Sequence, residues 1–260
     1  MTSVNVIWIG FAGSFFASLG TAGGALGALL IRRLSPALED GLLSGAAGIM
    51  LAATLFSLLL PALELAELQT GQPVPAVTIV IASLLIGALS LHLVHQHVPH
   101  EHFSTGREGP ENNAVGRMWL FVLAITLHNF PEGMAVGTGF AGGDMGNGLA
   151  LALGIGLQNV PEGLAVAVAL MSAGYTRARA CAIGVLTGFA EPIGGLFGSI
   201  AVSIAAALTP WAMGFAAGAM LYIISHEIIP ETHRGNYANL ATFSLIGGFV
   251  ILMFMDAVLN

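Results

Sequence analysis

The sequence reads HNFPEG at residues 128–133 and QNVPEG at residues 158–163, thirty positions apart. Each copy places metal-ligand side chains and a helix-breaking proline inside an otherwise apolar stretch. Ionisable groups within a bilayer cost several kcal/mol, and they commonly mark functional sites for that reason. Two matching copies therefore predict a functional site inside a membrane.

The composition predicts an integral membrane protein without a separate soluble domain. Hydrophobic residues make up 56% of the chain, charged residues only 8%, and the mean hydropathy is +0.86. A soluble domain carries about a quarter charged residues, so this chain could not cover a water-facing surface. The single cysteine, Cys181, excludes an intramolecular disulfide framework. We expect the lipid bilayer as a partner, and no nucleic acid.

Apolar runs of the roughly 20 residues that a spanning helix needs divide the chain into eight segments. We therefore predict an all-α polytopic membrane protein with eight transmembrane helices, forming one domain over residues 1–260. The N-terminus lacks a basic region before its first apolar run, which favours a retained first helix over a cleaved signal peptide. The predicted spans cover residues 4–30, 42–63, 75–94, 118–140, 147–172, 180–207, 211–232 and 239–258.

The basic residues predict how these helices are oriented. There are seven arginines and no lysine, and every arginine lies in or beside the connections after helices 1, 3, 5 and 7. Short cytoplasmic loops carry an excess of basic residues. We therefore expect those four connections in the cytoplasm and both termini outside. The arginines are Arg32, Arg33, Arg107, Arg117, Arg177, Arg179 and Arg234.

Helices 4, 5 and 6 should bring a set of polar side chains to one depth near the middle of the membrane. At 1.5 Å rise per residue, about eleven residues from a helix end reach that depth. Imidazole, carboxylate and amide groups together suit Zn²⁺, Cd²⁺, Fe²⁺ or Mn²⁺. Three buried glutamates without a nearby cationic side chain need a dication or protons as counter-charge, which disfavours a purely structural role. The predicted ligands are His128, Asn129, Glu132, Gln158, Asn159, Glu162 and Glu191.

Two further groups of candidate ligands lie towards the predicted cytoplasmic side. Near the end of helix 7, His226, Glu227 and Glu231 predict a weaker secondary or exit metal site. Residues 95–116 form the one long polar connection, which we expect to be a His-rich cytoplasmic loop that captures or senses metal. Its candidate ligands are His95, His97, His100 and His102.

With these residues in place, the chain resembles the ZIP (Zrt/Irt-like) family of divalent metal transporters, in particular its GufA-like branch. The doubled N-x-P-E-G motif carries the resemblance. It implies helices in a 3+2+3 arrangement with an inverted repeat, and transport into the cytoplasm by alternating access. Family members are often homodimers. The metal would be a substrate and not a cofactor.

The resemblance also divides the ligands between two neighbouring metal sites. It implies a primary site of His128, Glu132, Gln158 and Glu162. Asn129, Asn159 and Glu191 would complete a second site, with the carboxylates of Glu132 and Glu162 bridging the two. Gln158 stands where many family members have a second histidine, which leaves the metal preference open.

The motif spacing argues against enzymes, while two non-enzymatic alternatives stay open. A His-Glu-x-x-His metalloprotease motif is missing, because Ile-Ile-Pro follows His226-Glu227. Glu-x-x-His pairs of a di-iron enzyme are missing too. A cation channel and a metal-sensing receptor have the same ligand chemistry as a carrier. The short chain favours a bacterial cell membrane, with extracellular or periplasmic termini.

Overall fold

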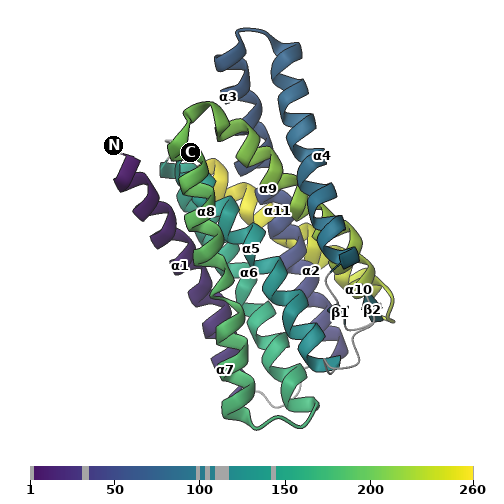
Figure 1. Cartoon of the computed structure of the whole chain (residues 1–260). Coiled ribbons are helices and arrows are strands. Elements are labelled where there is room, and N and C mark those ends of the chain that lie inside the picture. Colours follow the sequence, from purple (N-terminus) through teal and green to yellow (C-terminus); the bar gives the residue numbers. More distant parts are fainter. Residues whose placement is uncertain are drawn as a thin grey trace.

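The computed structural model describes residues 3–30, 35–97, 100–102, 106–108, 117–141 and 145–259. In these ranges the chain is a bundle of long helices with one short β-hairpin (Figure 1). The elements are α1 (Ser3–Gly27), α2 (Pro36–Ala52), η1 (Ala53–Leu59), α3 (Leu60–Thr70), α4 (Pro73–His97), β1 (His100–His102), β2 (Gly106–Glu108), α5 (Arg117–Ala141), α6 (Met145–Ser172), α7 (Arg177–Thr187), α8 (Ala190–Ile204), η2 (Ala206–Leu208), α9 (Thr209–Ile223), η3 (Ile224–Ile228), α10 (Ile229–His233) and α11 (Ala238–Leu259).

The helices confirm the prediction of a polytopic membrane protein. Within the described ranges, seven helical stretches are long and apolar enough to cross a membrane. They include α2–η1–α3, α7–α8 and α9–η3–α10, each as one stretch. The remaining predicted span, 118–140, corresponds to α5, whose 25 residues pack between α1, α6 and α8. The antiparallel hairpin β1–β2 lies in the predicted loop and was not expected from an all-α reading. The 3+2+3 arrangement stays a prediction.

The second span is much longer than the predicted 42–63. It runs continuously over Pro36–Thr70, a length of 35 residues. Ser35 caps its start by accepting a hydrogen bond from the Leu38 backbone N–H, and Pro36 occupies the first turn. At its other end, Gly71 adopts a left-handed conformation (φ 66°) that terminates the helix. At 1.5 Å per residue this stretch exceeds the roughly 30 Å hydrocarbon core, so α3 and the start of α4 project beyond the bundle (Figure 1).

The helices pack as two groups. In the first group, α1 contacts α6 and α8, and α5 contacts α8. In the second group, α2 contacts α11, and α4 contacts α9. The groups meet where α6 lies against α2 and α5 against α9, over an apolar core that includes Leu151 from the first group and Met50 and Met220 from the second. Both termini lie at the same end of the bundle (Figure 1).

Glycines allow the close helix contacts within each group. A Cβ atom on Gly24 of α1 would lie 1.9 Å from the Val160 carbonyl oxygen of α6. In the second group, a Cβ on Gly48 of α2 would lie 1.9 Å from the Leu245 carbonyl oxygen of α11. Contacts this short exist only where the side chain is a hydrogen, which is typical of helix pairs in membranes.

The two neighbouring glycines of α1 provide a matched test of this packing. Gly24→Ala should push α1 away from α6 and destabilise the protein by about 1–3 kcal/mol, because backbone cannot yield to a Cβ atom. Gly23→Ala should have little effect, because a Cβ there meets nothing within 4 Å. The thermal unfolding midpoints of the two purified variants in detergent measure the difference. Equal midpoints would contradict the packing described here.

Candidate metal centre

The two hexapeptide copies lie in the interiors of α5 and α6, where their polar side chains are buried. Both helices continue through their prolines, Pro131 and Pro161. Proline has no backbone N–H, so the carbonyl four residues earlier loses its helical partner in each helix. The carboxylate of Glu132 is fully buried and that of Glu162 is 6% exposed. The site therefore lies inside the bundle, as the sequence predicts.

A direct hydrogen bond joins the two copies. The side-chain amide of Gln158 donates to Glu132 Oε1 over 2.8 Å. Both side chains are fully buried. This bond uses the amide donor of Gln158 and one oxygen of Glu132, and it brings α5 and α6 together at the level of the motif.

The two motif asparagines are both anchored to backbone carbonyls of neighbouring helices. Asn129 Nδ2 donates to the Thr187 carbonyl oxygen over 2.9 Å. Asn159 Nδ2 donates to the Ala17 carbonyl oxygen over 3.3 Å. With the nitrogen of each amide held in this way, its oxygen faces away from the anchoring helix. Each asparagine thus keeps a side-chain oxygen that has no hydrogen-bond partner among the described residues.

Glu191 of α8 completes the cluster of carboxylates. Glu162 lies close to both Glu132 and Glu191, and Asn159 is also a neighbour of Glu191. The hydroxyl of Thr21 on α1 donates to Glu191 Oε1 over 3.1 Å. Thr21 is not among the ligands that the sequence predicts, because it is one of several polar residues in the first span and no motif singles it out.

The predicted ligands share a set of oxygens that lack hydrogen-bond partners. Buried polar atoms in proteins are nearly always hydrogen-bonded, so such a cluster calls for an explanation. Every atom in the set is an acceptor, and a bound cation or protons would satisfy all of them at once. Within the described part of the chain, the atoms are Asn129 Oδ1, Glu132 Oε2, Gln158 Oε1, Asn159 Oδ1, Glu162 Oε2 and Glu191 Oε2.

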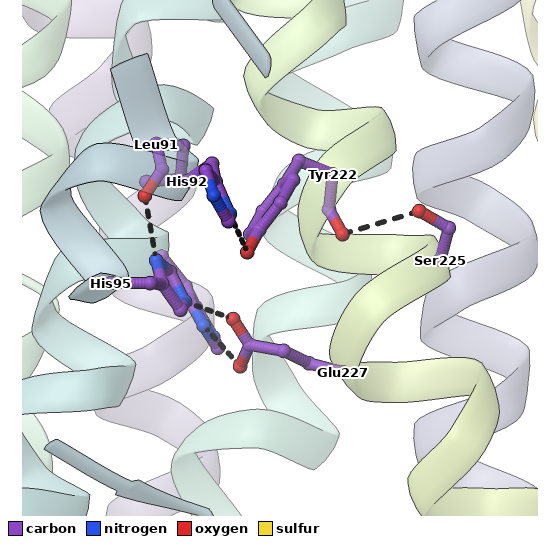
Figure 2. A network of polar contacts seen from close by, with 7 residues as sticks. Leu91, His92, His95, Tyr222, Ser225 and Glu227 are labelled. Carbon is purple, nitrogen blue, oxygen red and sulfur yellow. Dashed lines mark hydrogen bonds and ion pairs between the residues drawn. The ribbon is translucent and has the colours of Figure 1, made fainter. Parts of the chain in front are cut away.

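The seventh predicted ligand, His128, lies against a different partner. Its Nε2 is 2.7 Å from Glu227 Oε2 on η3. The other oxygen of Glu227 contacts His95 Nε2 on α4. Figure 2 shows the Glu227 carboxylate pointing at the His95 ring, with α4 and the α9–η3 helix side by side. Glu227 thus connects two histidines from separate helices.

His95 is a correction to the sequence analysis. It was expected in the polar loop, but it lies in the last turn of α4 and is only 2% exposed. Its Nδ1 bonds to the Leu91 carbonyl oxygen over 2.9 Å (Figure 2). An Nδ1–H that donates to a backbone carbonyl aims Nε2 at Glu227, and in metal-binding histidines the nitrogen held in this way is commonly the ligand. α4 continues to His97, so the helix is longer than the predicted 75–94.

His95, His128 and Glu227 form a compact group of possible ligands. Each contributes one ligand atom, these atoms lie within 4.8 Å of one another, and all three side chains are buried. Among the described residues, these three are the His, Cys, Asp or Glu side chains that come together at this separation. Two imidazoles and one carboxylate suit Zn²⁺ well. The sequence predicted these residues in three different sites: His95 in the loop, His128 in the primary site and Glu227 in the secondary or exit site.

The remaining candidates whose side chains are described are more exposed than this group. His226 is exposed, and its ring lies against Tyr222 with centroids 4.9 Å apart. Tyr222 also bonds to His92 Nδ1 over 3.1 Å (Figure 2). Glu231 is half-buried on α10, and His97 is exposed. His100 and His102 lie on β1, where the backbone alone is described, and residues 109–116 of the predicted loop lie outside the described ranges.

The sequence of this chain is similar to those of known zinc transporters. A family model described as ZIP zinc transporter matches residues 88–256. The chain is 45% identical over 247 residues to zinc transporter GufA of Myxococcus xanthus, covering 95% of this chain and 97% of that protein. It is 46% identical over 263 residues to zinc transporter ZIPB of Bordetella bronchiseptica, covering 100% and 85%. Zinc transporter ZIP11 of Homo sapiens is 34% identical, covering 94% and 95%. The family match includes every helix from α5 to α10.

Proposed function

Since this chain belongs to the ZIP zinc transporter family, in its GufA-like branch, we propose that it carries divalent transition-metal cations into the cytoplasm. Zn²⁺ is the foremost substrate, and Cd²⁺, Fe²⁺ and Mn²⁺ are further candidates. The observation that carries the proposal is the cluster of unpartnered buried oxygens on α5, α6 and α8. A dication replaces the missing hydrogen bonds and offsets the charge of the three clustered glutamates.

The cation first binds the oxygen cluster near the middle of the membrane. The carboxylates of Glu132 and Glu162 bridge two metal positions, and Glu191 contributes to the second position. Neutral amide oxygens complete the set, which makes the ligands weaker than a site of thiolates and imidazoles. Such a site suits a transporter, because the bound cation also has to leave.

The group of His95, His128 and Glu227 is the next position on the route to the cytoplasm. His128 lies four residues before Glu132 on α5, and His95 lies at the end of α4, where the His-rich connection begins. The positive-inside pattern puts that connection in the cytoplasm. A cation that leaves the oxygen cluster towards the cytoplasm therefore meets two imidazoles and a carboxylate.

Alternating access requires that the two helix groups move against each other. The oxygen cluster belongs to the first group, through α5, α6 and α8. Glu227 and His95 belong to the second group, through η3 and α4. The contact between His128 and Glu227 joins the groups, so it has to break or be replaced by metal ligation when they move. Both groups are held internally by close glycine contacts, which favours motion as two units.

Uptake by sealed proteoliposomes tests this function. Purified protein should take up Zn²⁺ with saturable kinetics, and Cd²⁺, Fe²⁺ and Mn²⁺ should compete to different extents. Flux at channel-like rates without saturation would show that the protein is a cation channel and not a carrier. Metal binding without any flux would show that the protein is a metal-sensing receptor and not a carrier. The homodimer that the family resemblance implies is checked by the mass of the purified protein.

The histidines after α4 should contribute little to transport itself. Replacing His97, His100 and His102 together by alanine is expected to keep the maximal uptake rate within about twofold, because His97 is exposed and all three lie after the buried His95. His95→Ala should instead reduce uptake strongly. Initial rates at several zinc concentrations compare the two. A triple variant as inactive as His95→Ala would show that the connection is part of the route.

A further inference from the structure

Thr21 on α1 makes a hydrogen bond that is unusual for a threonine inside a membrane helix. Its hydroxyl donates to Glu191 Oε1 over 3.1 Å, between residues 170 positions apart, and both side chains are fully buried. A hydroxyl in a helix interior normally bonds to a carbonyl three or four residues earlier in its own helix. Thr54, Thr126 and Thr138 all do so here.

The carbonyl that the Thr21 hydroxyl would ordinarily use accepts a different side chain in this structure. The carbonyl four residues earlier belongs to Ala17, and it accepts the side-chain amide of Asn159. As a result, Asn159 is anchored on α1, and the Thr21 hydroxyl donates to Glu191. Both bonds tie α1 to residues of the predicted second metal position.

Tight packing fixes the position of Thr21. A Cβ on Gly163 would lie 2.0 Å from the Thr21 carbonyl oxygen, so α6 touches α1 at this point. On the other side, a Cβ on Gly188 would lie 3.1 Å from Thr21 Cβ and 3.3 Å from its Cγ2. With neighbours on two sides, the threonine cannot change its rotamer easily. Its hydroxyl is thus a rigid donor to one oxygen of Glu191.

We propose that Thr21 is a positioning residue that occupies Glu191 Oε1 and leaves Oε2 alone to bind the transported cation. This inference rests on the proposed function. Glu191 Oε2 has no hydrogen-bond partner in the described part of the chain, whereas Oε1 has Thr21. A carboxylate oxygen that already accepts a hydrogen bond is a weaker cation ligand than its partner oxygen, so this arrangement favours binding of the cation through Oε2.

One-oxygen binding selects among cations by size. Zn²⁺ is satisfied by about four ligands at short distances, so one oxygen from Glu191 suffices. Larger dications take more oxygens and often use both oxygens of one carboxylate. The Thr21 hydroxyl therefore favours Zn²⁺ over a larger ion such as Cd²⁺. Partners of this kind, outside the ligands themselves, change metal affinity by about 10–100-fold when removed.

The test compares the preference for Zn²⁺ over Cd²⁺ in competition uptake by proteoliposomes. Thr21→Val keeps the shape of the side chain and removes the donor, and it should shift the preference towards Cd²⁺ by about tenfold. Thr21→Ser keeps the donor and should retain the wild-type ratio. The matched control is Thr138→Val, a buried threonine whose hydroxyl bonds within its own helix, and it should leave the ratio unchanged.

Three outcomes would overturn the inference: an unchanged ratio in Thr21→Val, an equal shift in Thr21→Ser, or an equal shift in the Thr138→Val control. Should Thr21→Val fail to insert, Thr21→Ala also lacks the donor and is judged by the same ratio. Failure of the proposed function is seen separately, because the wild-type protein would then take up neither ion.

Discussion

Replacement of Glu162 by alanine is expected to abolish zinc uptake while the protein still folds and reconstitutes. The proposed bridging role gives this carboxylate contact with both metal positions, so its loss removes ligands and negative charge from both. Its Oε2 has no hydrogen-bond partner among the described residues, so little structural contact is lost with it. The initial uptake rate should fall about 100-fold or more, because loss of a partner outside the ligand set already costs about 10–100-fold.

A matched replacement elsewhere separates this effect from a general loss of acidic charge. Glu67→Ala removes an exposed carboxylate near the end of α3, outside the proposed route, and should leave uptake near the wild-type rate. Thermal unfolding of both variants checks their folding. Undiminished uptake by a folded Glu162→Ala variant would falsify the bridging role.

Replacement of Glu227 by glutamine should slow transport and leave the oxygen cluster able to bind metal. Glutamine preserves the size of the side chain, but it removes the negative charge that faces His95 and His128. The cation then loses its one anionic ligand on the way to the cytoplasm. We expect a fall of about 10–100-fold in the uptake rate. Equilibrium zinc binding by the purified protein should change far less.

Glu67→Gln is the control for this variant, because Glu67 is exposed on α3 and lies outside the proposed route. We expect an uptake rate within about twofold of the wild type. If Glu227→Gln loses zinc binding and transport together, the two sites are not separate positions on a route. If it loses neither, the group of His95, His128 and Glu227 has a structural role.

Residue types and their spacing predict part of the candidate site. The sequence placed Glu132 and Glu162 of the doubled motif, and Glu191 of another helix, inside one bundle, because carboxylates in apolar helices have few stable places other than its interior. The motif could not show that Glu132 bonds to Gln158 or that Thr21 reaches Glu191. Those contacts depend on how the helices rotate and approach each other, which is decided by side-chain packing across the whole bundle.

For His95 the sequence led to a wrong prediction, because the residues that follow it are misleading. It precedes a polar stretch rich in histidine, which is typical of a loop. In the structure, α4 continues through it, and its ring meets a carboxylate 132 residues further along the chain. A helix end cannot be located to within one turn from composition, since the last turn gains its stability from tertiary contacts.

By itself, the sequence determined that this protein is a polytopic membrane protein with polar ligands deep inside helices. Hydrophobic runs and buried charges have large transfer energies, and these depend on residue type more than on neighbours. The tertiary structure alone decided which oxygens have hydrogen-bond partners. It also decided which histidine joins His128 and Glu227, and which helix donates a hydrogen bond to Glu191. These are differences of one hydrogen bond or one helix rotation, and they are fixed only when all the helices pack together.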